Sequence, residues 1–133
     1  MARITSESPV DILSAQGATG AGTAVNVQDF RHITVVVSSA NTADLTVHAQ
    51  GAIAATAPTW TSAAALANEW SYIGMYDYED ATFKDGDTGI VFAGADDTAI
   101  YTINTDGLKW LNFRVSAWVA GDVTVRAYAF TNG

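Results

Sequence analysis

The chain has 133 residues, of which 49% are hydrophobic and 15% charged, a composition typical of one globular domain and not of a disordered segment. Its formal net charge is −8 with only six Lys and Arg residues, which argues against a nucleic-acid partner because phosphate backbones need clustered basic residues. The absence of cysteine excludes disulfides and Cys-ligated metals, and no apolar run is long enough for a secretory signal or a membrane span.

Segments in which apolar and polar residues alternate recur about every ten positions and predict β-strands with one buried face. The first is an extended piece at about residues 9–14. We interpret residues 1–14 as an N-terminal arm that reaches a neighbouring molecule, with an ordinary edge strand or a frayed terminus as the alternatives. A glycine-rich loop follows at 16–24. It lacks the Gly-Lys-Ser/Thr ending of a phosphate-binding loop and leads into a short strand at 24–28.

The next two strands, near residues 31–38 and 44–50, both carry their apolar side chains at odd positions. With a turn at 39–42, they predict a hairpin in which the odd positions of both strands face the core. Between residues 51 and 68 the alternation is lost around Trp60. A segment of that length is long for a connection in a compact domain, so it indicates a functional loop or a missed element.

Alternation returns at residues 70–78 and is followed by an Asp- and Gly-rich turn at 84–89. Short strands are then predicted at 89–93 and 98–104. Together with the other segments this gives about eight or nine strands and no domain boundary. We therefore expect an all-β fold, a single-domain antiparallel β-sandwich or jelly-roll that spans residues 1–133.

The last two segments, 109–119 and 121–131, alternate most clearly, again with apolar residues at odd positions. A three-residue turn at 120–122 would join them into a second hairpin with both apolar rows toward the core. The outer face of that hairpin is rich in aromatic residues and arginine, which protein interfaces favour. We predict a subunit or partner interface there, formed by Trp110, Arg114, Trp118, Arg126, Tyr128 and Phe130.

Sites for chemistry are scarce in the sequence. Five acidic residues cluster between Asp77 and Asp87 and could hold calcium, but their spacing matches no EF-hand loop and suits turns better. His32 and His48 are predicted on one outer face without a convincing third metal ligand. No nucleophile elbow or Ser/His/Asp set is evident. We therefore expect no enzyme activity, no cofactor and no metal.

Aromatic side chains leave one ligand-binding alternative open. Trp60, in its irregular loop, could stack on a sugar ring as aromatic residues do in carbohydrate-binding β-sandwiches. On this hypothesis the chain is a carbohydrate-binding or receptor-binding module. Trp70 and Tyr72 are instead expected to line the core, where aromatic residues bury large areas.

Four stretches of the chain resemble small β-rich virion structural proteins of tailed bacteriophages. They are GTAVNVQDFRHI (22–33), DGDTGIVFAG (85–94), NTDGLKWLN (104–112) and VAGDVTVRAYAF (119–130). The resemblance extends from about Gly17 onward and contains no catalytic motif. It implies a capsid decoration (cement) protein, made in the host cytoplasm and placed on the virion surface. Such a protein is expected to be a homo-oligomer, with a trimer favoured, that binds the major capsid protein or other virion proteins.

Overall fold

The structure, a computed structural model, describes residues 4–6, 9–59 and 69–132. Those residues form antiparallel β-strands and no helix, which confirms the predicted all-β class. Eleven strands are present: β1 (Ile4–Ser6), β2 (Val10–Gln16), β3 (Gly20–Ala21), β4 (Val25–Asn26), β5 (His32–Ala52), β6 (Ser71–Ile73), β7 (Met75–Asp77), β8 (Thr82–Lys84), β9 (Ile90–Ala93), β10 (Thr98–Asn104) and β11 (Trp110–Asn132).

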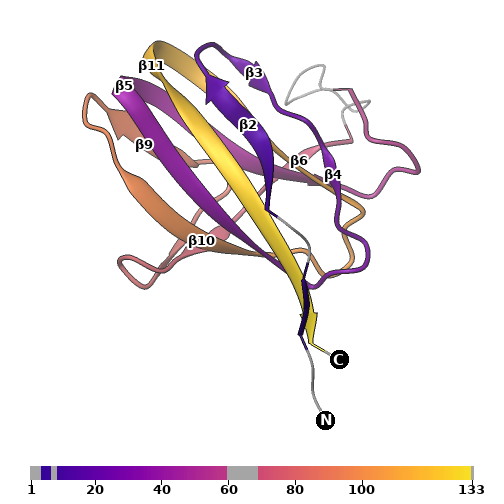
Figure 1. The fold of residues 1–133 in the computed structure, drawn as a ribbon. Coiled ribbons are helices and arrows are strands. Elements are labelled where there is room, and N and C mark those ends of the chain that lie inside the picture. Colours follow the sequence, from indigo (N-terminus) through magenta and orange to yellow (C-terminus); the bar gives the residue numbers. More distant parts are fainter. Residues whose placement is uncertain (1–3, 7–8, 60–68, 133) are drawn as a thin grey trace.

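Two long strands, β5 and β11, organise the fold. They pair with each other antiparallel over nearly their whole lengths, from Trp110 opposite Ala52 to Ala129 opposite Ile33. Both strands turn over together at the top of the molecule, whereas the two chain ends lie at the bottom (Figure 1). Each long strand therefore contributes one half to each of two packed layers.

This arrangement corrects the two predicted hairpins. Residues 31–38 do not pair with 44–50, and 109–119 do not pair with 121–131, because each pair belongs to one continuous bent strand. The two halves of each strand lie in opposite layers, with their odd positions turned to the shared core. Alternation of period two states which face of a strand is buried but not which strand lies beside it, so it fits both arrangements.

The bend is built from residues that tolerate unusual backbone geometry. Gly121 has φ of +76°, and a Cβ added there would lie 2.5 Å from the Cα of Ala43 on β5. Asn41 and Thr42 also have positive φ. The Asp96 carboxylate accepts hydrogen bonds from the amides of Thr42 (3.0 Å) and Ala43 (2.9 Å), which lowers the pKa of Asp96. The corner thus needs a residue without a side chain and a carboxylate cap.

The first layer contains β1 and β2, the second half of β11, the first half of β5, then β10, β7 and β8. The second layer contains β3 and β4, the first half of β11, the second half of β5, then β6 and β9. The chain passes between the layers at several other points. β6 lies in the second layer and β7 in the first, and only Gly74 separates them.

The core lies between the layers and consists mainly of the odd positions of the long strands, as predicted. Val35, Val47, Phe113 and Val115 are fully buried. The pattern fails near the bend, where Val119 is 68% exposed although we expected residues 117 and 119 to face inward. The cause is a bulge, since the register of β11 against β5 shifts between Val115 and Ala117.

Residues 10–14 of the predicted N-terminal arm belong to the sandwich itself. Strand β2 pairs with β11, and its Ile12 and Leu13 lie in the core, so this segment is an ordinary edge strand. Before it, β1 pairs with the last residues of β11, with Ile4 opposite Asn132. This two-stranded ribbon extends below the rest of the sandwich (Figure 1).

Candidate interaction face

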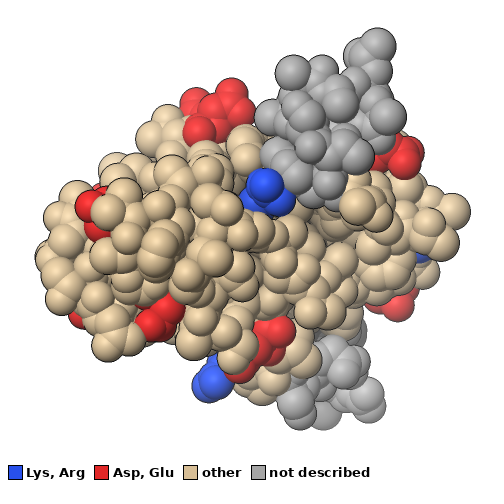
Figure 2. Space-filling view, turned by 90° about the horizontal axis from the view of Figure 1, so that it is seen from above, with Lys and Arg blue, Asp and Glu red and all other residues tan. Residues whose placement is uncertain are grey.

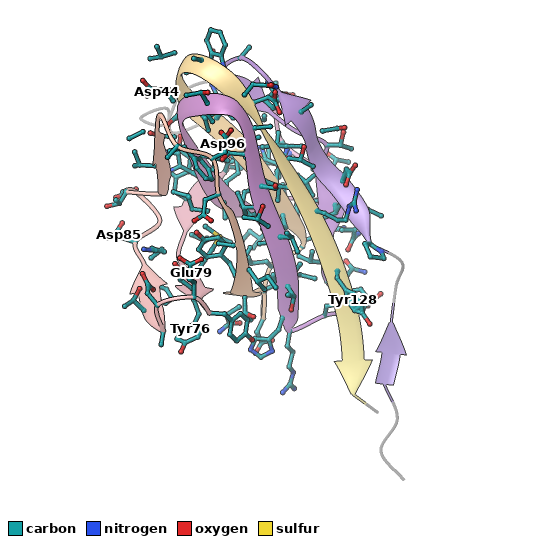
Figure 3. The ribbon with its side chains drawn as sticks, turned by 60° about the vertical axis from the view of Figure 1, so that its left-hand side comes forward. Asp44, Tyr76, Glu79, Asp85, Asp96 and Tyr128 are labelled. Carbon is teal, nitrogen blue, oxygen red and sulfur yellow. The ribbon has the colours of Figure 1, made fainter. Side chains whose placement is uncertain are left out.

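The outer face of the first layer carries a continuous surface of aromatic, aliphatic and hydroxyl side chains, which we call the tyrosine face. The cross-strand register places one row of side chains from β8 to β11 and a second row beside it. Figure 3 shows Tyr76 and Tyr128 on strands at the two sides of this layer. The face consists of Thr34, Val36, Ser38, Tyr76, Tyr78, Phe83, Ile100, Thr102, Thr124, Arg126 and Tyr128.

Large apolar groups on this face are open to solvent. Phe83 is 71% exposed and Tyr78 57%. The rings of Tyr76 and Tyr78 meet edge to face with centroids 5.5 Å apart, and Thr102 Oγ1 donates a hydrogen bond to Tyr78 Oη at 2.8 Å. These contacts hold the two rings in place while leaving them accessible. An ordered exposed aromatic group suits recognition, because little side-chain entropy is lost on binding.

Charge is almost absent from the tyrosine face. Its one charged member, Arg126, forms an ion pair of 2.8 Å with Asp11 on the neighbouring strand β2. A shallow hollow of about 270 Å³ lies between Arg126, Val36, Ser38 and Thr124. From the end at which β5 and β11 bend, most of the visible surface is likewise neither acidic nor basic (Figure 2). The tyrosine face therefore has the composition of a contact surface more than of a solvated one.

The structure divides the interface predicted from the sequence. Arg126 and Tyr128 belong to the tyrosine face, whereas Trp110, Arg114 and Trp118 lie on the first half of β11, in the other layer. The backbone of Phe130 pairs with Ser6, and its side chain lies outside the described part of the protein. The predicted residues do not form one surface because the bend in β11 sends its two outer faces in opposite directions.

The tryptophans of the second layer make local hydrogen bonds. Trp110 Nε1 donates to the carbonyl of Ala54 at 3.0 Å, and Trp118 Nε1 donates to the carbonyl of Gly121 at 2.8 Å. Trp70 is buried, as expected, and its Nε1 donates to the carbonyl of Pro58 at 2.6 Å. Trp60, the predicted ligand-binding residue, lies outside the described residues.

A polar cluster on the outer side of the second layer was not foreseen. His48 is buried, with Nδ1 2.9 Å from the carbonyl oxygen of Gly86 and Nε2 2.8 Å from Ser116 Oγ. Its ring stacks on Tyr72 with centroids 4.1 Å apart. Burial raises the pKa of Tyr72, against the effect of the Arg114 guanidinium, which lowers it. His48 thus has a structural role, and His32 lies on the other layer, so the two histidines do not share a face.

Gln50, beside this cluster, is a second polar residue whose burial the sequence did not predict. Its side chain is completely buried, and neither of its amide atoms has a hydrogen-bond partner within the described residues. The only available signal was a polar residue at an even position of a strongly alternating strand, which predicts an exposed side chain. Burial of an unsatisfied amide is unfavourable.

Asp85, in the acidic cluster, organises a turn. Asp85 Oδ1 accepts hydrogen bonds from the amides of Asp87 and Thr88, an arrangement typical of a turn. No group of three or more His, Asp or Glu side chains in the described ranges is arranged to hold a metal ion. These hydrogen bonds fit the interpretation of Asp85 and its neighbours as turn residues.

An apolar hollow of about 440 Å³ opens near the chain termini, lined by Val10, Val25, Val27, Phe30 and their neighbours. Its polar lining residue, Asn26, uses its side-chain oxygen to accept a hydrogen bond from the amide of Gln28. The hollow contains no titratable side chain among its lining residues.

Comparison with known proteins relates the chain to two prophage proteins by fold. No protein-family model and no curated protein matches it. Among solved structures, the SPBc2 prophage-derived protein YomS superposes with a TM-score of 0.69 and 18% identity over 98% of this chain and 96% of that one. The PBSX exported protein XepA gives a TM-score of 0.69 and 14% identity over 98% of this chain and 38% of its own length.

The described residues contain no helix of the length and apolar character that crossing a bilayer requires.

At these levels of identity, the two structural neighbours show that the fold is shared and say nothing further about this chain's own activity. The fold of this protein is thus one that prophage-derived proteins use.

Proposed function

We propose that this chain is a bacteriophage protein without enzyme activity that works through protein–protein contacts. The more specific role proposed is that of a capsid decoration subunit on the virion surface. The observation that carries the proposal is the tyrosine face, a broad, charge-poor surface with exposed Phe83, Tyr78 and Ile100. The shared fold with two prophage-encoded proteins supports the phage origin.

The size of the tyrosine face fits a modest contact. It crosses the strands from β11 to β8, which are spaced by about 4.8 Å, and extends over about six residues of about 3.3 Å each. Its flat area is then roughly 19 by 20 Å, about half of the about 800 Å² of accessible surface that each partner contributes to a standard interface. Repetition of such contacts in a symmetric oligomer, with a trimer favoured, would multiply modest affinities for the major capsid protein.

The first test is the mass of the purified protein by light scattering after size exclusion, for the wild type and two matched variants. Ile100→Asp puts a charge on the tyrosine face, and Val91→Asp puts one on the outer side of the second layer. Both side chains are exposed, at 46% and 61%, so neither change should unfold the protein. We expect an oligomeric wild type, a monomeric Ile100→Asp variant and an unaffected Val91→Asp variant. A monomeric wild type at high concentration would contradict self-association.

Virion placement needs a separate measurement. Phage particles purified on a density gradient are probed with an antibody against the chain, with detergent-free washing as the control for loose adsorption. We expect the protein to co-sediment with intact heads. Its absence from heads, with an oligomeric protein in solution, would contradict the decoration role and leave the contact function standing.

A further inference from the structure

A cleft opens at one side edge of the sandwich, on the inner side of strands β7, β8 and β10, whose outer side carries the tyrosine face. On the β11 side of the sheet β2 to β4 cover the edge, whereas on the other side β9 of the second layer separates from β7, β8 and β10 of the first. The resulting cleft has a volume of about 370 Å³. Glu79 lies at this edge (Figure 3), and Asp77, Asp80 and Asp97 also line the cleft.

Negative charge exceeds positive charge in the cleft. Lys84 is its one cationic lining residue, and its Nζ lies 3.6 Å from Asp77 Oδ2 and 3.4 Å from Asp80 Oδ2. Glu79 and Asp97 have no ion-pair partner within the described residues. Two carboxylates at the cleft are therefore left without a cation, and the low-dielectric walls concentrate their field.

The hydroxyl of a largely buried tyrosine lies near these carboxylates. Tyr101 lines the cleft and is only 4% exposed, yet its hydroxyl makes no hydrogen bond with any residue in the described ranges. Burial, and then the charges of Asp77, Asp97, Glu79 and Asp80, raise the pKa of Tyr101 to about 12. The hydroxyl consequently stays protonated at neutral pH, with both lone pairs available to a donor.

The remaining wall of the cleft is apolar. Ile90 and Phe92 of β9 line it, and each is largely buried. A ligand that fits must combine an aliphatic or flat stem, for contact with Phe92 and Tyr101, with a cationic head that donates several hydrogen bonds. An arginine side chain has this combination, since its guanidinium carries five donors and stacks on aromatic rings.

We infer that the cleft binds an arginine side chain presented by a partner protein, with Glu79, Asp97 and the Tyr101 hydroxyl as acceptors. A metal ion fits less well. Within the described residues, no three carboxylates of the cleft lie close enough together to hold one. This contact uses side chains other than those of the tyrosine face. The two proposals can therefore fail separately.

The test is a nuclear magnetic resonance titration of the full chain with the peptide Ac-Gly-Arg-Gly-amide. The matched control peptide carries citrulline, which has the shape of arginine without its charge. We expect saturable shifts confined to Tyr101, Phe92 and the 77–80 segment with the arginine peptide, and none with citrulline. Added salt should weaken the binding.

Variants identify the acceptors. Glu79→Gln removes a carboxylate that has no ion-pair partner within the described residues. It should weaken binding of the arginine peptide about three- to tenfold, the size expected for one charged hydrogen bond. Asp106→Asn, an exposed carboxylate in the turn before β11, should leave affinity unchanged. Tyr101→Phe should also weaken binding while leaving the fold intact, because the lost hydroxyl bonds no described residue.

Three results would overturn the inference. One is the absence of saturable shifts up to the solubility limit of the peptide. Another is shifts spread over acidic residues outside the cleft and unaffected by Glu79→Gln. The last is saturation of the same resonances by Ca²⁺ with no response to the arginine peptide, which would make the cleft a cation site of another kind.

Discussion

Replacement of Gly121 by alanine tests the bend that defines this fold. A Cβ at Gly121 would lie 2.5 Å from Ala43 Cα and 2.7 Å from the carbonyl oxygen of Ala40, both backbone atoms of the paired strand β5. No side-chain rotation can relieve contacts with backbone atoms. Strands β5 and β11 would have to move apart at the point where both turn between layers.

The expected loss combines two effects. Alanine at the positive φ of +76° costs about 1–2 kcal/mol, and forced overpacking costs about 1–3 kcal/mol. A less flexible unfolded chain returns about 0.4–1 kcal/mol. We therefore expect Gly121→Ala to lower the free energy of unfolding by about 2–4 kcal/mol, a large part of the roughly 5–15 kcal/mol typical of a domain.

Gly107 is a matched control for this experiment. It also has positive φ, +88°, but a Cβ there would meet nothing within 4 Å. Gly107→Ala should therefore show the backbone penalty alone, about 1 kcal/mol. Urea unfolding of both variants, with a slope equal to that of the wild type, would measure the difference. An equal loss of unfolding free energy in Gly121→Ala and Gly107→Ala would refute the reasoning. It would mean that Gly121 has no close neighbour on β5, as expected if it lay in a simple hairpin turn.

Three further predictions concern the polar groups of buried residues. Gln50→Leu should raise the free energy of unfolding by about 1–2 kcal/mol, because it removes a buried amide that has no hydrogen-bond partner among the described residues. Asn112→Leu should lower the free energy of unfolding, since the Asn112 side chain donates a hydrogen bond to the carbonyl of Gly22 and accepts one from the amide of Phe113. Urea unfolding measures both variants. A destabilised Gln50→Leu variant would show that the Gln50 amide is hydrogen-bonded. Tyr101 has a folded-state pKa of about 12 against an ordinary 10.0, so its contribution to stability is complete below pH 10 and is lost as the pH rises toward 12. Between pH 10 and pH 12 the free energy of unfolding of Tyr101→Phe should therefore fall by about 2 kcal/mol less than that of the wild type. Equal losses for the two proteins in unfolding measured as a function of pH would contradict the raised pKa of Tyr101.

The candidate surfaces depended on tertiary structure more than the strands did. Arg126 and Tyr128 were identified from aromatic and arginine content alone, and they do belong to the tyrosine face. Their neighbours Tyr76, Phe83 and Ile100 come from strands far away in the sequence, and no local pattern links them. The cleft around Tyr101 likewise joins β7, β9 and β10 across the open edge.

The sequence by itself determined most of the strand positions and the buried face along most of the two long strands. Alternation at residues 31–38, 44–50 and 109–131 is a local consequence of the β backbone, and the burial of Val35, Val47 and Phe113 follows from it. Only the tertiary structure decided which strands pair. Alternation fixes which face of a strand half is buried, and that face is the same whether the other half pairs beside it or lies in the facing layer. The bend at Gly121 resolves that choice, and it alone separates Trp118 from Arg126 onto opposite sides of the protein.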